Sequence, residues 1–427
     1  MFAFAKRIIG KIRGSKDGKT LVRNFGFLSV LEVTTKIFPL ITLPYLARVL
    51  GVECFGVLAI GTAVVAYFQS VTNYSFEYRS VRDAARVRGS IEDFSKIVSL
   101  TFFSKALLML LSILLLSLLT CTIPFMRQHA AVIWFTFLII PSCVLNTDWV
   151  FQALEDMKYI TIRSVSARLL FTVLVFVLIK SPDDYLMQPI LTAFGSLVPC
   201  LWGIAVLRKK YGVRFYCPKL AESLRMLREG FNLFVTLFLP TIYTQLNTLL
   251  LGTYNGKAAT GIYSGGTRFT SLSYSLFQIV SRTFYPFFAR RMDKHKLYVK
   301  FTMLVALCIS LVFFFFAKPL VHVFLGQEFY ETIKVLRIVA FTPIAVALMN
   351  CYGTNYLVLK GQERTMRNII IVVTVIGLIF GIVGAKEFSY VGVAVASLVT
   401  QMIRGLLVFY YARKLEKNAI VEKHESV

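Results

Sequence analysis

Long apolar runs joined by short polar turns are the feature that most limits what this chain can fold into. A helix that crosses the hydrocarbon core of a bilayer needs roughly 20 apolar residues, and the chain contains twelve stretches of about that length or more. The stretches cover residues 25–50, 54–78, 97–124, 130–153, 157–180, 185–207, 229–253, 258–288, 299–325, 331–359, 365–386 and 389–412. We therefore predict an all-α integral membrane protein with about twelve transmembrane helices.

The composition supports this prediction. Hydrophobic residues make up 57% of the 427 residues and the mean hydropathy is +0.69, which is more apolar surface than a soluble domain can bury. The basic N-terminal segment lacks the apolar core of a cleavable signal peptide. The seven cysteines are scattered and the four histidines lie far apart. We interpret the cysteines as small buried side chains and expect no metal site.

The net charge of +25 is distributed as a topology signal. Every second loop is rich in Lys and Arg, as are both termini. The outward loops contain few basic residues, namely Arg127, Lys180, Lys257, Lys318, Lys334 and Lys386. Because basic loops stay in the cytoplasm, we predict that both termini are cytoplasmic. We interpret the excess charge as lying near anionic lipid, and we expect no nucleic-acid partner.

The two halves of the chain match each other at an offset of 205 residues. Matched pairs include Gly56 with Gly261, Ala84 with Ala289, Arg86 with Arg291, Leu154 with Leu359 and Tyr185 with Tyr390. Six helices repeated in one orientation indicate two halves related by a pseudo-two-fold axis along the membrane normal. The predicted parts are a basic cytoplasmic N-terminus (1–24), a six-helix half (25–207), a basic connector (208–228), a second six-helix half (229–412) and a cytoplasmic tail (413–427).

Cationic residues within the apolar stretches indicate a hydrated central cavity between the halves. A cation at mid-membrane costs about 2.5–3.5 kcal/mol on insertion scales, so each needs a partner or water. Setting the loops aside, we identify seven such residues: Lys36, Arg48, Lys105, Arg268, Arg282, Arg337 and Arg404. Arg48, Arg337, Lys105 and Arg282 could alternatively extend to the lipid headgroups.

Two helices carry their arginines in polar stripes. At about 100° per residue, Ser271, Ser275 and Arg282 fall on the same narrow face as Arg268. In the last stretch, Tyr390, Ser397 and Gln401 share a face with Arg404. Guanidinium groups bind phosphate oxygens in bidentate fashion, so a cationic cavity suits an anionic substrate. The predicted substrate-binding residues are Arg268, Arg404, Arg282, Ser271, Ser275, Gln401, Lys105, Arg48 and Arg337. The alternative is that the stripes only join helices together.

Acidic residues within the stretches are candidates for coupling to a proton or sodium gradient. Asp148, in the segment NTDW, is the first candidate, unless it pairs with a cavity arginine. Glu32 is the second, although Lys36 lies one helical turn away and can neutralise it.

A cytoplasmic gate follows from the repeat. Subtracting the offset from Arg282 gives Glu77, and repeat-related residues occupy matching depths in the two halves. We predict that Glu77 and Arg282 pair when the cytoplasmic side is closed. The alternative is that Glu77 pairs with Arg79 or Arg82 in the adjacent loop.

Three segments resemble a known family: FPLITLPYLARVLGVECFG at 38–56, TQLNTLLLGTYNGKAATGIYSGGTR at 244–268 and YLVLKGQERTMRN at 356–368. They are similar to the polysaccharide and O-antigen repeat-unit flippases (Wzx-type) of the multidrug/oligosaccharidyl-lipid/polysaccharide exporter superfamily. The resemblance implies that an undecaprenyl-diphosphate-linked oligosaccharide crosses from the cytoplasmic to the periplasmic leaflet of a bacterial inner membrane. Many relatives carry an acidic residue where this chain has Asn247, so the resemblance implies no ion coupling at that position.

Other functions remain as alternatives or are disfavoured. A cation-coupled multidrug antiporter and a lipid II flippase of the peptidoglycan pathway remain open. The chain lacks the GxxxxGK[ST] phosphate-binding loop, and its outward loops are short, so we expect neither ATP hydrolysis nor another enzyme activity, and no cofactor. Expected partners are the lipid-linked oligosaccharide, membrane lipids, a proton or sodium gradient, and a polysaccharide polymerase with its chain-length proteins.

Overall fold

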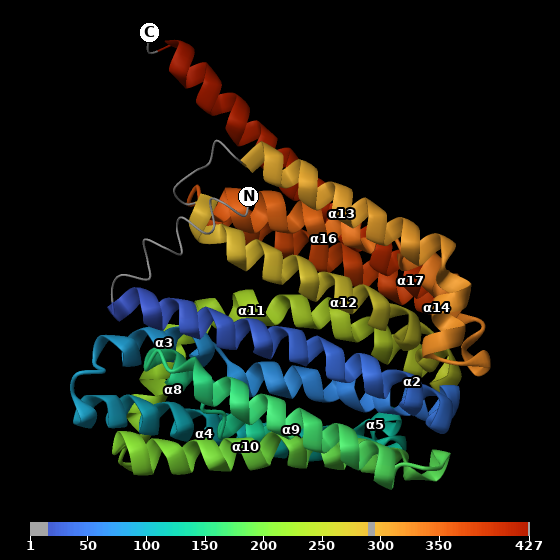
Figure 1. The fold of residues 1–427 in the computed structure, drawn as a ribbon. Coiled ribbons are helices and arrows are strands. Elements are labelled where there is room, and N and C mark those ends of the chain that lie inside the picture. The colour runs from blue at the N-terminus through green and yellow to red at the C-terminus, as the bar shows by residue number, and fades with distance from the viewer. Residues whose placement is uncertain (1–15, 289–294, 426–427) are drawn as a thin grey trace. The chain divides into compact units, whose positions relative to one another are not determined.

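Every element of the described chain is a helix. The computed structural model describes residues 16–288 and 295–425 (Figure 1). Up to Tyr254 the helices are α2 (Lys16–Asn73), α3 (Phe76–Arg86), α4 (Ile91–Thr122), α5 (Pro124–Gln128), α6 (Ala130–Phe137), α7 (Ile140–Val144), α8 (Asp148–Ala153), α9 (Met157–Leu178), η1 (Pro182–Leu186), α10 (Met187–Tyr211) and α11 (Leu220–Tyr254). The others are α12 (Gly256–Phe288), α13 (His295–Phe315), α14 (Ala317–Phe324), η3 (Gln327–Phe329), α15 (Thr332–Val339), α16 (Thr342–Leu348), η4 (Met349–Val358) and α17 (Glu363–Glu425).

The described residues contain nine candidate membrane spans, so the chain is a multi-pass membrane protein. Two of the spans, Ile37–Arg86 and Glu363–Glu416, are 50 and 54 residues long, which is more than twice the length needed for one crossing. Each is interrupted by a residue with a non-helical backbone, Gly51 with φ 69° and Ser389 with φ 53°. These breaks lie at turns that the sequence predicts. The number twelve stays a prediction, because α12 is not among the nine.

Two predicted spans are broken into shorter helices. Residues 130–153 form α6, α7 and α8, and Pro141 lies at the start of α7, where its missing N–H does no harm. The Asn146 side chain then accepts a hydrogen bond from the backbone N–H of Asp148 at 3.0 Å, at the start of α8. Residues 331–359 form α15, α16 and η4, and η4 is a ten-residue π-helix. The first of these breaks places the polar segment Asn146–Asp148 inside an otherwise apolar run.

The helices group into two compact units. The first comprises the chain up to Tyr45 together with Phe68–Leu237, and the second comprises Leu46–Tyr67 together with Phe238–Val427. Aromatic side chains such as Trp149 and Phe151 form the core of the first unit. The segment between α10 and α11 is anchored to α4 of that unit, because Ser95 and Ser99 accept hydrogen bonds from the backbone N–H groups of Arg214 and Tyr216 at 3.1 and 3.0 Å.

Two glycines matched by the repeat lie against each other within the second unit. A Cβ added to Gly56 of α2 would lie 1.9 Å from the carbonyl oxygen of Lys257 and 2.9 Å from the backbone nitrogen of Gly261. A Cβ on Gly261 of α12 would lie 2.1 Å from the carbonyl oxygen of Val52. Only glycine permits backbones to approach this closely. The contact thus joins two residues that the 205-residue offset matches, and the two-fold relation of the halves stays a prediction.

Candidate functional site

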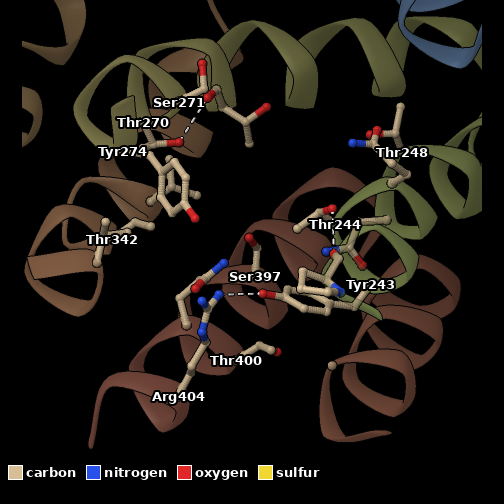
Figure 2. Close-up of a pocket in the computed structure, with 18 of the residues that line it drawn as sticks. Tyr243, Thr244, Thr248, Thr270, Ser271, Tyr274, Thr342, Ser397, Thr400 and Arg404 are labelled. Atoms are coloured by element: carbon tan, nitrogen blue, oxygen red, sulfur yellow. Dashed lines mark hydrogen bonds between the residues drawn. The ribbon is translucent and has the colours of Figure 1, made fainter. Parts of the chain in front are cut away.

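A polar pocket of about 460 Å³ lies within the second unit (Figure 2). Its walls come from α11, α12, α16 and α17, with Val339 at the end of α15. The volume falls in the range of roughly 300–1,000 Å³ that small-molecule sites occupy. The polar lining residues are Thr241, Tyr243, Thr244, Gln245, Asn247, Thr248, Tyr263, Thr267, Thr270, Ser271, Tyr274, Thr342, Ser397, Thr400, Gln401 and Arg404. Most of the lining residues therefore carry a hydroxyl or amide group.

The face of α12 that lines the pocket differs from the predicted stripe. The lining residues are Tyr263, Thr267, Thr270, Ser271 and Tyr274, which recur at the three- and four-residue spacing of one helix face. This face is centred roughly 70° round the helix from the stripe that contains Arg268. Ser271 belongs to both faces. The prediction from sequence was based on the charge of Arg268 and left out the tyrosines and threonines. Their spacing in the sequence indicates that they share one helix face.

The predicted stripe of α17 contributes more directly. Ser397, Gln401 and Arg404 line the pocket together with Thr400, and Figure 2 shows Ser397, Thr400 and Arg404 on one side of it. Tyr390, the fourth member of the predicted stripe, does not line it.

Tyr390 instead donates a hydrogen bond to Glu331 at 2.8 Å. The Lys334 ammonium and the Tyr390 hydroxyl both hydrogen-bond to the Glu331 carboxylate and hold its pKa below the usual value.

Arg404 is the only charged residue among the described residues that line the pocket. Its side chain is buried, with a residue exposure of 7%. Its Nη1 donates a hydrogen bond to the Tyr243 hydroxyl at 2.8 Å (Figure 2). Its Nε is buried and has no hydrogen-bond partner in the part of the chain that the structure describes. A guanidinium stays protonated in proteins, so the pocket holds a fixed positive charge that an anion can neutralise.

Four other predicted substrate-binding residues lie outside this pocket. Arg268 is exposed, and its guanidinium carbon lies 5.7 Å from the centre of the Phe55 ring. Arg48 is exposed and donates to the carbonyl oxygen of Val323 at 2.7 Å. Arg337 is exposed on α15, and the Ser275 hydroxyl donates to the backbone carbonyl of Ser271 one turn earlier. Their roles in binding stay predictions.

Lys105 is fully buried in the first unit, at 0% exposure. Its ammonium donates to the carbonyl oxygen of Cys143 at 3.1 Å and to the side-chain oxygen of Asn73 at 3.5 Å. An ammonium held by these internal acceptors does not extend to the headgroups, so the snorkelling alternative is wrong for Lys105.

Asp148 forms an ion pair with Arg163 of α9. Arg163 also donates to the hydroxyl of Thr147 at 2.6 Å and to the side-chain oxygen of Asn146 at 3.3 Å. The seven cations identified from sequence did not include Arg163 or Arg168, although both lie within the predicted stretch 157–180 and within α9. The position of Arg163 inside an apolar run was the signal that could have revealed a partner for Asp148.

Several predicted residues lie outside the described side chains. The side chains of Glu32, Lys36 and Arg282 are among these, so the Glu32 pairing and the Arg282 half of the gate stay predictions. Glu77 is exposed in the first turn of α3.

The alternative partners of Glu77 are engaged elsewhere. Arg79 pairs with Asp83 and Glu229, and Arg82 pairs with Asp83. Among the residues that the structure describes, no group of three or more His, Cys, Asp and Glu side chains is arranged to hold a metal ion.

Comparison with known families identifies the chain. The model of the family described as polysaccharide biosynthesis protein matches residues 21–292, which is more than half of the sequence. The chain belongs to the polysaccharide biosynthesis protein family. Two relatives of this family member are 23% and 24% identical to it, cover 92% and 89% of it and are themselves covered to 97%. They come from Escherichia coli (strain K12) and Shigella dysenteriae, and each is named "Putative O-antigen transporter".

Solved structures of transporters share the fold of this family member. The lipid II flippase MurJ in an inward closed conformation superimposes with a TM-score of 0.74 at 15% identity, over 91% of this chain and 87% of that one. A mutant of the Vibrio cholerae MATE transporter VcmN superimposes with a TM-score of 0.59 at 16% identity, over 94% and 97%. At such identities the likeness shows the two-lobed all-helical fold, as the sequence predicts.

Proposed function

We propose that this protein is a flippase for undecaprenyl-diphosphate-linked oligosaccharides, the repeat units of O-antigen or a related polysaccharide. The unit moves from the cytoplasmic to the periplasmic leaflet by alternating access. The lipid tail stays in the bilayer while the diphosphate and sugars cross through the protein. Both termini are cytoplasmic and the membrane is a bacterial inner membrane.

The observation that carries this proposal is the chemistry of the pocket around Arg404. Its hydroxyl and amide groups can exchange hydrogen bonds with sugar hydroxyls, and its tyrosine rings offer apolar faces to sugar rings. The single guanidinium suits a phosphate oxygen, because charge-assisted hydrogen bonds are roughly twice as strong as neutral ones. The family and the names of the two full-length relatives point to the same substrate class.

The same pocket disfavours a cation-coupled multidrug antiporter. Among its described lining residues there is no Asp or Glu, so a cationic drug would meet the positive charge of Arg404 without a counter-charge. A lipid II flippase shares the fold and would also need to bind a diphosphate. The relatives named for O-antigen transport favour the polysaccharide repeat unit over lipid II.

Energy and partners complete the proposal. Asp148 is the candidate for exchange of a proton or sodium ion, and Asp148→Asn should then abolish the response of transport to an uncoupler. A response equal to that of the wild type would exclude Asp148 from coupling. The flipped unit would be passed to a polysaccharide polymerase and its chain-length proteins.

Deletion of the coding sequence in its own host tests the proposal. We expect the ladder of surface polysaccharide to disappear and lipid-linked units to accumulate on the cytoplasmic side. The wild-type chain should restore the ladder. A normal ladder in a deletion strain with no redundant flippase would show that the protein transports something else.

A further inference from the structure

A second cavity lies within the first unit, at the break between α7 and α8. It has a volume of about 220 Å³ and is bounded by α7, α8, α9 and α10. Its polar wall consists of Ser142, Asn146, Asp148, Arg163, Ser164, Arg168 and Ser196. The volume is several times the roughly 30 Å³ that one water molecule occupies in the liquid, and it is below the usual size of a drug or disaccharide site. The cavity therefore suits a small polar group.

The arginine at the centre of this wall is held rigidly and remains incompletely bonded. The side chain of Arg163 is 4% exposed, and its two Nη atoms donate to Asn146, Thr147 and Asp148. Its Nε has no hydrogen-bond partner among the residues that the structure describes. A buried donor without a partner costs roughly 1–3 kcal/mol, so an acceptor entering the cavity would be favoured at this atom.

Glycine keeps this arrangement in place from the side of α10. A Cβ on Gly203 would lie 2.2 Å from the Thr147 hydroxyl and 3.1 Å from Nη1 of Arg163. A contact of 2.2 Å would force Thr147 to shift, so α10 approaches the network this closely because residue 203 has no side chain. The guanidinium is therefore positioned before any ligand arrives.

The electrostatic balance of the wall favours an anion. The described wall carries two guanidinium groups and one carboxylate, and the buried ammonium of Lys105 also acts on the Asp148 carboxylate. The negative charge of Glu77 in turn attracts the Lys105 ammonium. Asp148 keeps 29% of its side-chain surface exposed, so the ion pair is not sealed within the packed helices.

We propose that this cavity is an oxyanion site of the first unit, in which a phosphate group binds Arg163 and Arg168 and competes with Asp148 for Arg163. The Asp148 carboxylate pairs with the Arg163 guanidinium until a phosphate oxygen replaces it, and the Ser164 hydroxyl offers a further donor. The proposal rests on the proposed function only for the source of the phosphate, which is the diphosphate of the lipid-linked substrate. The phosphate of an anionic phospholipid has the same chemistry.

Calorimetric titration with inorganic pyrophosphate tests the site. The full chain is placed in phosphatidylcholine nanodiscs and carries Arg404→Gln, which removes the guanidinium of the other pocket. We expect Arg168→Gln to weaken binding at least about tenfold. Asp148→Asn should strengthen it at least about threefold, because the competing charge is gone. The control is Arg208→Gln, an exposed arginine of the same unit that lies 4.9 Å above the Phe215 ring, and it should leave the affinity unchanged.

The variants and lipids separate the possible outcomes. Absence of pyrophosphate binding, or an unchanged affinity in either Arg168→Gln or Asp148→Asn, would overturn the proposal and leave the Arg163 pair as a structural contact. If the natural phosphate comes from a phospholipid, phosphatidylglycerol in the nanodisc should lower the pyrophosphate affinity, and it should not do so if the phosphate comes from the substrate. The polysaccharide ladder does not enter this titration, so the site and the proposed function can fail separately.

Discussion

Replacing Arg404 with Gln gives a prediction whose size follows from the pocket. The substitution keeps hydrogen-bonding capacity but removes the only charge among the described lining residues. A hydrogen bond to a charged group contributes about 1.5–3 kcal/mol. At 1.4 kcal/mol per tenfold, the apparent affinity for a diphosphate-linked substrate should fall roughly 12- to 140-fold. Arg404→Lys should recover part of this loss, because lysine keeps the charge and lacks the planar fork.

The Arg404→Gln variant should lose substrate affinity without losing stability. A buried arginine in a membrane helix costs about 2.5–3.5 kcal/mol to insert, and only part of that is offset by the 2.8 Å hydrogen bond to Tyr243. Arg404→Gln should therefore unfold at a temperature no lower than the wild type. Tyr243→Phe should unfold at a lower temperature, because it leaves the guanidinium with one partner fewer, at a cost of about 1–3 kcal/mol.

Transport titrations test the predicted loss of affinity, and thermal unfolding in detergent tests the predicted stability. The matched control is Arg367→Gln, an exposed arginine near the start of α17, which should change neither quantity. Wild-type affinity in Arg404→Gln, or a large drop in its unfolding temperature, would refute the reasoning and make Arg404 a residue that joins α17 to α11.

Three further predictions concern other parts of the chain. Gly56→Ala must move α2 and α12 apart by at least about 1.1 Å, from 1.9 to 3.0 Å, and should cost about 1–3 kcal/mol of stability. The control Gly89→Ala, whose added Cβ meets nothing within 4 Å, should not lower stability. Equal unfolding temperatures for Gly56→Ala and Gly89→Ala would rule out the close contact. Arg268→Ala should impair transport at normal membrane abundance, and full activity would limit Arg268 to its contact with an aromatic ring. Glu77→Arg and Arg282→Glu should each impair transport and the double variant should recover part of it, whereas additive loss would remove the gate.

The sequence predicts the membrane class and the turns near Gly51 and Ser389, because these depend on local properties. It does not predict the breaks inside 130–153 and 331–359. Hydropathy over roughly 20 residues identifies a span regardless of its neighbours. The backbone breaks at Gly51 and Ser389 lie where short polar turns separate apolar stretches. Gly56 and Gly261, which the 205-residue offset matches, pack against each other, although the match alone did not predict this contact.

The walls of the sites were harder to predict because they depend on which helix faces meet. Helix periodicity places Tyr263 and Arg268 of α12 on different faces but does not say which face another helix covers. In the structure, the face of α12 that carries the tyrosines and threonines lines the pocket. Arg163 could have been identified from sequence as a cation inside the stretch 157–180, but its pairing with Asp148 could not, because the two lie on different helices that only the fold brings together.

The central claim is tested most directly by following one lipid-linked oligosaccharide across a membrane. Purified protein is reconstituted in liposomes that carry an undecaprenyl-diphosphate-linked repeat unit, and a membrane-impermeant glycosidase reports which leaflet holds the sugar. We predict that the wild-type protein exposes sugar from the inner leaflet to the enzyme, and that Arg404→Gln does so more slowly. Sugar that stays protected in liposomes containing folded wild-type protein would contradict the assignment of this chain as a flippase for that substrate class.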